Sequence, residues 1–472
     1  MKNTILLSGI VLVGIGFAGF AGNPQRMGHT VLLPRNSNPD DAGLYNAFID
    51  VPHGYAYFLG NYLWKLSITN GLPVAVCAPT NTGSSSFAVL DSAGGYAYIV
   101  RNPSVYRYAL GTGTNAVTGA GALTVSGVNA IGAVGLDDAD PNPTNHNLYV
   151  FCRINGAPTR VEKIRLGTFT EGAYAGLNAG ETNLGSCLAD ATHGYVYLAT
   201  TAVGATNAEI IKIKMPPGTN APVRIGSVNL GFTGEGIGFG SLDATNGYAY
   251  YGTYGYTNYP SRIYKVALGA GDAAPSLVGH IDLAQGRAQL SLSVIDPVNG
   301  FVYFANDNTY PGGVHQFKLN GTNLPIEIGY LPFLSGPSNN LPDTVSTFNV
   351  TTNSDGVLPY GEVYFRSAVF DPVRGNAYFG QDSKPNQVVM VQVARPDPCT
   401  LTGTKQPDGA FQIGFTNIQG GAFSVLSATN LNLALTNWTV LGVVTDSPLG
   451  QFQFTDPLVT NKPQQFYRVQ SP

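Results

Sequence analysis

Acidic residues recur at one position along the chain, where they could form a cation site. Eight or nine residues before a repeated aspartate, the chain has Asp41, Glu181, Glu235 and Glu362, with Arg287 in the same place in another copy. Carboxylates that converge can coordinate Ca²⁺ or bind a cationic group, and the arginine would weaken their field. The alternative is that each acid pairs with a basic residue or a backbone amide of a neighbouring repeat.

A second candidate for binding is a group of tyrosines. Tyr254, Tyr256 and Tyr259 fall in the segment YGTYGYTNYP, and Tyr62 and Tyr310 fall in the equivalent segments of other repeats. Tyrosines interleaved with Asn, Gly and Thr suit stacking on sugar rings, or a protein interface, where tyrosine is enriched. Packing between repeats is the competing explanation for part of this set.

Most familiar catalytic and metal-binding motifs are missing. The sequence has no G-x-S-x-G, H-E-x-x-H, P-loop or dinucleotide-binding pattern, and its six histidines show no paired ligand spacing. The four cysteines, Cys77, Cys152, Cys187 and Cys399, fit no zinc motif. A disulfide between Cys152 and Cys187 is expected because they fall in neighbouring repeats, and buried free thiols are the alternative.

The composition indicates which elements position these residues. Charged residues make up only 11% of the 472 residues, against about 25% in a typical soluble domain. The 59 glycines and 26 tyrosines indicate strands joined by many tight turns, so an all-β protein is expected. The formal net charge of −4 and the lack of a basic run argue against nucleic acid as a partner.

The N-terminus resembles an export signal. Lys2 precedes an apolar run over residues 5–17, and Gly19-Phe20-Ala21 offers small residues for cleavage, so residues 1–21 are predicted to be a signal peptide. The run is shorter than the roughly 20 residues that span a bilayer, although an uncleaved anchor is the alternative. The mature protein is expected to have no membrane span and to be secreted, extracellular or at the cell surface, with the periplasm as a further location.

A repeat organises most of the chain. An aspartate, a tight turn and a tyrosine seven positions after the aspartate recur at Asp50, Asp91, Asp190, Asp243, Asp296 and Asp371, and a longer copy runs from Asp137 to Tyr149. Glycine supplies the positive φ that such turns need, and the aspartate can accept hydrogen bonds from turn N–H groups. A basic residue recurs in the third strand of the repeat, at Lys65, Arg107, Lys163, Lys212 and Lys265.

Four strands in each repeat are typical of a β-propeller blade, so residues 22–394 are predicted to form a seven-bladed β-propeller of four-stranded antiparallel blades. The last copy lacks a fourth strand before the linker 395–398, and a strand at about residues 29–33 is expected to supply it. The acidic position would then lie at the mouth of the central channel. The tyrosines and a long insertion, residues 332–361, are expected on the same face.

The repeat also resembles a known family. The pattern D-x-x-x-G-Y-A-Y followed by I-x-K-V-x-L is similar to the NHL/YVTN-like propeller repeats of exported bacterial proteins, over roughly residues 26–396. The last copy departs from it, with Gln392 where other copies have lysine or arginine. Such propellers include binding modules, scaffolds and some enzymes, so the resemblance implies a fold and not an activity.

A second domain follows the linker. Residues 399–472 contain short alternating runs separated by Asn, Gly and Pro, which predict a small β-sandwich of immunoglobulin or fibronectin type. The segment FSVLSATNLNLALTNWTVLG and the chain end resemble a C-terminal domain that is widespread in exported proteins of environmental bacteria. That resemblance implies no ligand.

Two functions are open at this point. The first is an exported, non-catalytic binding or scaffold protein, whose propeller face binds a glycan or a protein partner and whose C-terminal domain presents or attaches it. It would need no cofactor other than calcium. The alternative is an extracellular polysaccharide-active hydrolase or lyase that uses carboxylates at the channel mouth, and glycoside hydrolysis needs two of them about 5 to 10 Å apart.

Overall fold

The structure is a computed structural model of the chain. It describes residues 24–470, except for residues 33–42, 70–71, 84, 86, 156, 183, 201–206, 233–235, 255–260, 284–288, 307–311, 334–343, 346–364, 382–385, 394–400, 417–421, 431–432, 434–436, 446–450 and 458–464. The predicted signal peptide 1–21, the predicted linker 395–398 and nearly all of the predicted insertion 332–361 therefore lie outside the described residues. None of the described helices is long and apolar enough to cross a membrane.

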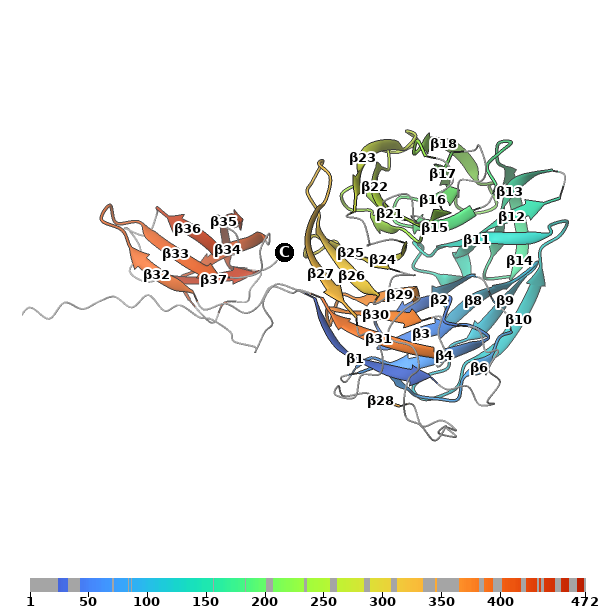
Figure 1. The fold of residues 1–472 in the computed structure, drawn as a ribbon, viewed down its shortest axis with the longest axis horizontal. Coiled ribbons are helices and arrows are strands. Elements are labelled where there is room, and N and C mark those ends of the chain that lie inside the picture. Colours follow the sequence, from blue (N-terminus) through green and yellow to red (C-terminus); the bar gives the residue numbers. More distant parts are fainter. Residues whose placement is uncertain are drawn as a thin grey trace, which may run out of the picture. The chain divides into compact units, whose positions relative to one another are not determined.

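The chain divides into two compact units. The larger comprises Arg26–Ile295 and Val302–Gln392, and the smaller comprises Met1–Gln25, Asp296–Phe301 and Val393–Pro472. The described residues confirm an all-β chain with repeated four-stranded antiparallel sheets, shown in Figure 1.

Most sheets of the larger unit are made of strands that follow one another along the chain. They are β2 (Asn46–Asp50), β3 (Tyr55–Leu59), β4 (Tyr62–Ser67) and β5 (Val74–Ala75), with β6 (Thr80–Asn81) also on β4; β7 (Phe87–Asp91), β8 (Tyr96–Arg101), β9 (Ser104–Ala109) and β10 (Thr118–Thr124); β11 (Ala130–Asp137), β12 (Asn147–Ile154), β13 (Ala157–Arg165) and β14 (Thr170–Gly176); β15 (Leu184–Asp190), β16 (Tyr195–Thr200), β17 (Glu209–Lys214) and β18 (Val223–Asn229). Next come β19 (Gly236–Ile237) and β20 (Ser241–Asp243), which both pair with β21 (Tyr248–Tyr254), then β22 (Arg262–Ala267) and β23 (Ser276–Asp282); and β24 (Leu290–Asp296), β25 (Phe301–Asn306), β26 (Gly313–Lys318) and β27 (Ile326–Pro332). A 3-10 helix, η1 (Pro143–Asn145), lies between β11 and β12.

One sheet combines segments from the two ends of the larger unit. β29 (Phe365–Asp371), β30 (Asn376–Gln381) and β31 (Asn386–Gln392) are followed in the sheet by β1 (Gln25–Leu32) and then by β28 (Thr344–Val345). β1 thus takes the place that a fourth strand has in the other sheets. β28 pairs with β1 in parallel, Thr30 opposite Thr344.

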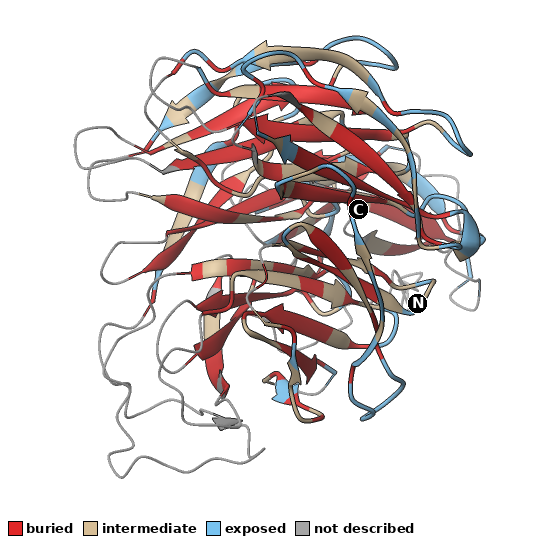
Figure 2. Cartoon of the chain, turned by 90° about the vertical axis from the view of Figure 1, so that its right-hand side faces the viewer, coloured by how far each residue is buried: buried red, intermediate tan, exposed pale blue. Residues whose placement is uncertain are grey.

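The first strands of the sheets contact one another in a closed order. β2 contacts β7, β7 contacts β11, β11 contacts β15, β15 contacts β20, and β29 contacts β2. Ser241 Oγ of β20 donates to Ser293 Oγ of β24, and Ser291 Oγ of β24 donates to Phe365 O of β29, both at 2.8 Å. This order is consistent with a β-propeller. The fourth strands β10, β14 and β23 are largely exposed, and Figure 2 shows the burial of the remaining strands.

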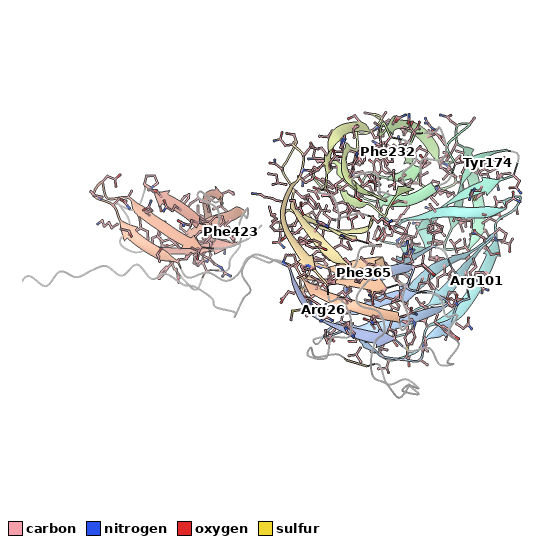
Figure 3. All side chains as sticks on the ribbon, in the orientation of Figure 1. Arg26, Arg101, Tyr174, Phe232, Phe365 and Phe423 are labelled. Atoms are coloured by element: carbon pink, nitrogen blue, oxygen red, sulfur yellow. The ribbon has the colours of Figure 1, made fainter. Side chains whose placement is uncertain are left out.

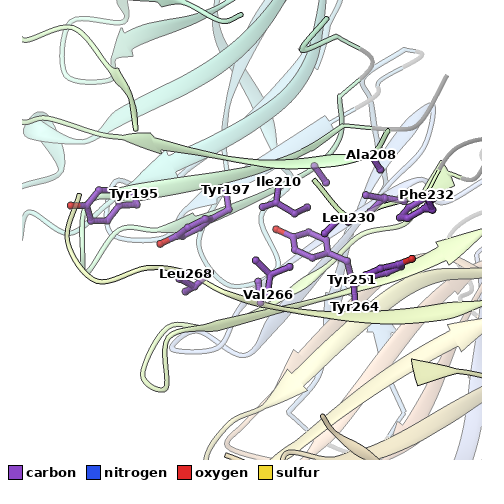
Figure 4. Close-up of a cluster of buried hydrophobic side chains, with 13 residues drawn as sticks. Tyr195, Tyr197, Ala208, Ile210, Leu230, Phe232, Tyr251, Tyr264, Val266 and Leu268 are labelled. Carbon is purple, nitrogen blue, oxygen red and sulfur yellow. The ribbon is translucent and has the colours of Figure 1, made fainter. Parts of the chain in front are cut away.

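Apolar side chains fill the space between neighbouring sheets. Between β15–β18 and β19–β23, Tyr197 and Ile210 pack with Phe232, Tyr251 and Tyr264 in the cluster of Figure 4, and Figure 3 places Phe232 among the other side chains of the unit. A sheet with two apolar faces cannot be stable alone, since both faces would meet water. Stacking of successive sheets removes this surface.

Each repeated aspartate organises the hairpin between the first two strands of its sheet. The aspartates at 50, 91, 190, 243, 296 and 371 are at most 4% exposed. Asp243 Oδ1, for example, accepts from Asn246 N at 3.2 Å, and Gly247 closes the turn with a φ of +75°. Neighbouring hairpins are also joined, because Ser92 Oγ donates to Asp50 Oδ1 at 2.8 Å and His146 Nδ1 lies 3.0 Å from Asp91 Oδ1.

The recurrent lysines of the third strands bind the next sheet. Lys212 is fully buried, and its Nζ donates to the carbonyl oxygens of Leu268, Gly269, Gly271 and Ala273 at 2.6 to 3.1 Å. These carbonyls belong to the turn between the third and fourth strands of the next sheet. The ring of Tyr195 lies beneath the ammonium, 4.1 Å from Nζ to the centroid, which adds a cation–π interaction.

The same contact is made from three other sheets. Lys65 donates to Leu110 O, Gly111 O and Asn115 O, Lys163 donates to Pro216 O, and Lys265 donates to Gly321 O and Asn323 O. Burial lowers the pKa of all four lysines from the usual value, because desolvation disfavours the charged form. Carbonyl oxygens and tyrosine faces offset that cost.

The strand register corrects the interpretation of the last repeat. Lys65 lies opposite Tyr57, and Lys212 lies opposite Tyr197. In the last sheet the residue opposite Tyr378 is Met390, whereas Gln392 lies opposite Asn376 at the strand end. Met390 is therefore the counterpart of the lysines, and it packs in the apolar cluster between the last sheet and β2–β5.

The predicted disulfide is wrong. Cys152 and Cys187 are free thiols, as is Cys77, whereas Cys399 lies outside the described residues. Cys152 packs in the cluster between sheets β7–β10 and β11–β14, but Cys187 packs against the cluster on the other face of β11–β14. The two sulfurs therefore lie on opposite sides of one sheet, and the burial that separates them raises the pKa of both thiols.

The smaller unit contains two three-stranded sheets. β33 (Phe411–Thr416) lies between β32 (Thr402–Lys405) and β36 (Gln451–Asp456), and β34 (Ala422–Ala428) lies between β35 (Thr439–Thr445) and β37 (Phe466–Gln470). Side chains from both sheets, including Phe415, Phe423 and Tyr467, share one apolar cluster. The Tyr467 hydroxyl donates to buried Asp456 at 2.9 Å.

The lysine contact predicts a large loss of stability on substitution. Lys212→Met should lower the free energy of unfolding by about 2–4 kcal/mol, because several buried carbonyls lose their donor. Lys214→Met is the matched control, since this side chain is 42% exposed and pairs with exposed Asp272 on the same turn, so its loss should leave the free energy of unfolding nearly unchanged. Equal losses in urea unfolding would contradict the role assigned to Lys212.

The aspartate hairpins predict a loss of stability that is caused by backbone conformation and not by a steric clash. A Cβ on Gly247 would meet no atom within 4 Å, but the φ of +75° disfavours any L-residue, so Gly247→Ala should cost about 1–2 kcal/mol. Gly176 of β14 has equal space around it and no positive φ. Thermal unfolding should leave Gly176→Ala near the wild-type midpoint, and a similar drop in both variants would argue against backbone strain.

Candidate functional site

A polar pocket opens at one end of the sheet β15–β18. Its volume is about 370 Å³. It is formed by the segment that leads from β14 to β15, the end of β16, the start of β17 and one face of β18. The lining residues are Asn178, Ala179, Gly180, Glu181, Thr200, Asn207, Glu209, Arg224, Ser227 and Asn229.

A buried ion pair forms one wall of the pocket. Arg224 Nε donates to Glu181 Oε1 and Oε2 at 2.9 and 3.0 Å, and Nη2 makes a further bond to Oε1. The Asn178 backbone N–H donates to Glu181 Oε2 at 2.7 Å, and Ser227 Oγ bonds Arg224 Nη2 at 3.0 Å. Glu181 is 5% exposed. The pair is thus neutral as a unit and fixed in orientation.

The second carboxylate of the pocket, Glu209, stands at the first position of β17. Thr200 holds its backbone from the facing strand, since Glu209 N donates to Thr200 Oγ1 at 2.9 Å and Thr200 Oγ1 donates back to Glu209 O at 3.4 Å. The side chain is half-buried, and among the described residues no ion pair to it is found. Two carboxylates against one guanidinium leave the pocket with a net charge of −1.

Glu181 lies elsewhere in the fold than the sequence indicates. It precedes β15, the strand that contacts the first strands of both neighbouring sheets, so it was expected at the channel mouth. Its partner Arg224 lies on β18, at the opposite edge of the sheet. The reason is physical, because a carboxylate that is 95% buried needs a cation or several donors, and Arg224 on the outer strand supplies them.

The other predicted site residues are mostly outside the described residues. These are Asp41, Glu235, Arg287, Glu362, Tyr256, Tyr259 and Tyr310. Tyr254 ends β21, with its side chain not described. Tyr62 begins β4, is half-buried and packs against the apolar cluster beside the last sheet. The described part of the chain holds no group of three His, Cys, Asp or Glu that could bind a metal ion, so the calcium site stays a prediction.

The sequence analysis missed Arg224 and Glu209. Arg224 is 43 residues from Glu181 and occurs in an outer strand, β18, whose residues are mostly half-buried. Glu209 precedes the apolar residues of β17, and a single acid at a strand start is common. In the sequence, Glu209 is distinguished only by lying three residues before the recurrent Lys212, and this spacing does not predict a pocket.

The two ends of the sheets differ in their connections and contacts. The aspartate hairpins and the turns held by lysines lie at one end, whereas Glu181, Thr200 and Glu209 of the pocket lie at the other, and Arg224 reaches them from the start of β18, opposite Ile213. At the pocket end, the second and third strands are joined by two residues in the sheets β2–β5, β7–β10 and β11–β14, but by eight residues, 201–208, in β15–β18. Long connections on a rigid scaffold are where binding residues are usually found.

Comparisons with known proteins leave the function open. No family model and no curated protein matches the chain. Among the solved structures that match is a protein from Lactobacillus plantarum, which is 15% identical, with 61% of this chain and 84% of that chain covered and a TM-score of 0.48. The chemistry of the site has therefore to be argued from its own geometry.

The ion pair predicts a non-additive effect of substitution. Arg224→Met leaves the Glu181 carboxylate buried without its cation and should cost about 1–3 kcal/mol of unfolding free energy, given the partial exposure of the arginine. Adding Glu181→Gln removes the orphaned charge and should restore part of this loss. A double-mutant cycle in urea would measure the coupling, and purely additive losses would show that the pair is not coupled.

Proposed function

We propose that the chain is an exported, non-catalytic binding protein, in which residues 22–394 form a seven-bladed β-propeller that binds a glycan in the pocket at the end of β15–β18. Residues 399–472 form an immunoglobulin-like domain that presents or attaches the propeller. The observation that carries this proposal is the pocket itself: eight of its ten lining residues are polar, with amides, hydroxyls and an oriented guanidinium. Such groups match the alternating donors and acceptors of sugar hydroxyls.

The state of Glu181 favours binding over catalysis. A general acid or base must exchange a proton with the substrate, but both oxygens of Glu181 accept hydrogen bonds from Arg224. Glycoside hydrolysis needs two carboxylates that act on the substrate, and of the two in this pocket Glu181 is committed to Arg224, which leaves Glu209 alone. The enzymatic alternative would rest on Glu235 and Glu362, which lie outside the described residues.

The place where the chain leaves the larger unit supports a presenting role for the C-terminal domain. β31 ends at Gln392, which pairs with Asn376 beside the hairpin that starts at Asp371. The chain therefore leaves this sheet at the hairpin end, whereas the pocket of the larger unit lies at the opposite end. The segment toward the C-terminal domain therefore starts at the strand end that carries the aspartate hairpin.

A blocking substitution tests the proposal. Ala179→Trp places an indole in the pocket without removing a polar contact, and it should abolish retention of the mature protein on immobilised polysaccharides that retain the wild type. Val373→Trp, at a 66% exposed position of a hairpin, is the matched control and should bind normally. Soluble products are analysed in parallel, and release of oligosaccharides would replace the binding proposal with the enzymatic one.

A further inference from the structure

We infer that the pocket selects a sugar that carries a protonated primary amine, as in a deacetylated amino-sugar polymer. This inference rests on the proposed function and names the ligand of the same pocket. It follows from the charges of the described lining residues, the anchored backbone of Glu209 and the small share of apolar side chains among those residues.

The balance of charge favours a cation. Among the lining residues that the structure describes, Arg224 alone is cationic, and Glu181 neutralises it through Nε and Nη2. An anionic ligand would have to compete with this buried carboxylate for the guanidinium and would also meet Glu209. A ligand ammonium would instead form an ion pair with Glu209 and make the net charge of the occupied pocket zero.

Glu209 is positioned to make that pair. Its backbone is bonded through both N–H and C=O to the hydroxyl of Thr200, which is 4% exposed, so the strand start cannot shift easily. Its side chain is half-buried in the pocket wall, where a charge pair is screened less than at an open surface. The anchored backbone limits how far the Glu209 carboxylate can move, which lowers the conformational entropy lost when it binds an ammonium.

The rest of the lining favours a sugar over a lysine side chain. A lysine would bring four methylene groups, which need apolar surface, but only Ala179 and Gly180 among the lining residues lack a polar side chain. The amide of Asn207 can donate and accept, as ring hydroxyls do, and Asn229 offers its Nδ2 while its Oδ1 accepts from Gly231 N at 2.7 Å. The pocket is therefore suited to a hydroxylated ring with one positive group.

Calorimetric titration of residues 22–472 with three soluble oligosaccharides tests the inference. The ligands are the glucosamine hexamer, its fully N-acetylated form, in which the amine is blocked, and cellohexaose, which has hydroxyls only. We expect the amine form to bind at least tenfold more tightly than the other two at low salt, and we expect this preference to shrink as salt is raised. Equal affinity for all three would overturn the inference while leaving the glycan-binding proposal intact.

The isosteric variant Glu209→Gln assigns the effect to one group. It should lose about tenfold in affinity for the amine form with no change for cellohexaose, and an unchanged circular dichroism spectrum would show that it is folded. Asp138→Asn, an exposed carboxylate just after β11, changes the net charge equally and should behave as wild type. If both variants lose affinity alike, net charge is responsible and the inference fails. If the wild type binds a lysine-rich peptide and none of the sugars, both this inference and the proposed function fail.

Discussion

The fold depends on a buried ammonium in one sheet and the carbonyl oxygens of the next. A lysine without acceptors would be too costly to bury, so Lys65, Lys163, Lys212 and Lys265 require the neighbouring turn to be in place. The interaction also fixes direction, because the lysine always reaches the sheet that follows in the chain. In the sheet β24–β27 the residue in this place is Gln316, whose Nε2 bonds Tyr303 Oη at 3.4 Å. In the next sheet, β29–β31 with β1, the fourth strand comes from the N-terminal end of the chain. No turn therefore joins its third and fourth strands, and there are no turn carbonyls for a lysine to bind.

Because of this constraint, the contacts that stabilise the fold and the connections that can vary lie at different ends of the strands. The lysine contacts, the aspartate hairpins and the bonds between hairpins all lie at one end of the sheets. Substitutions at the other end leave these contacts untouched, and connections of two to eight residues are accommodated there between the second and third strands. A pocket can therefore be built in one sheet, as in β15–β18, without a compensating change in the others. The arrangement therefore permits a binding site that is formed by one sheet alone.

Repetition explains which features the sequence could predict. The aspartate, the glycine and the third-strand lysine recur at fixed offsets, so their hairpins and strands were visible without coordinates, and the all-β repeated sheets are confirmed. The pocket occurs once, and its pair joins Glu181 to Arg224 across the width of a sheet. No local pattern encodes that contact. The disulfide prediction was wrong because it used only the order of the repeats. Neighbouring repeats contain Cys152 and Cys187, but the face of the sheet on which a side chain lies depends on its position along the strand, and these two lie on opposite faces of β11–β14.

The same geometry explains the surroundings of Glu181, the one residue of the recurrent acidic position that the structure describes. Glu181 stands just before a first strand, where it accepts a hydrogen bond from the Asn178 backbone and is within reach of the outer-strand side chains of its own sheet. Among these side chains the donor is Arg224, and the resulting pair is rigid and neutral. The acid with chemical freedom is Glu209, which belongs to no recurring position. In a repeat protein the residues shared by all copies maintain the scaffold, and a binding function is more readily carried by residues that break the repeat.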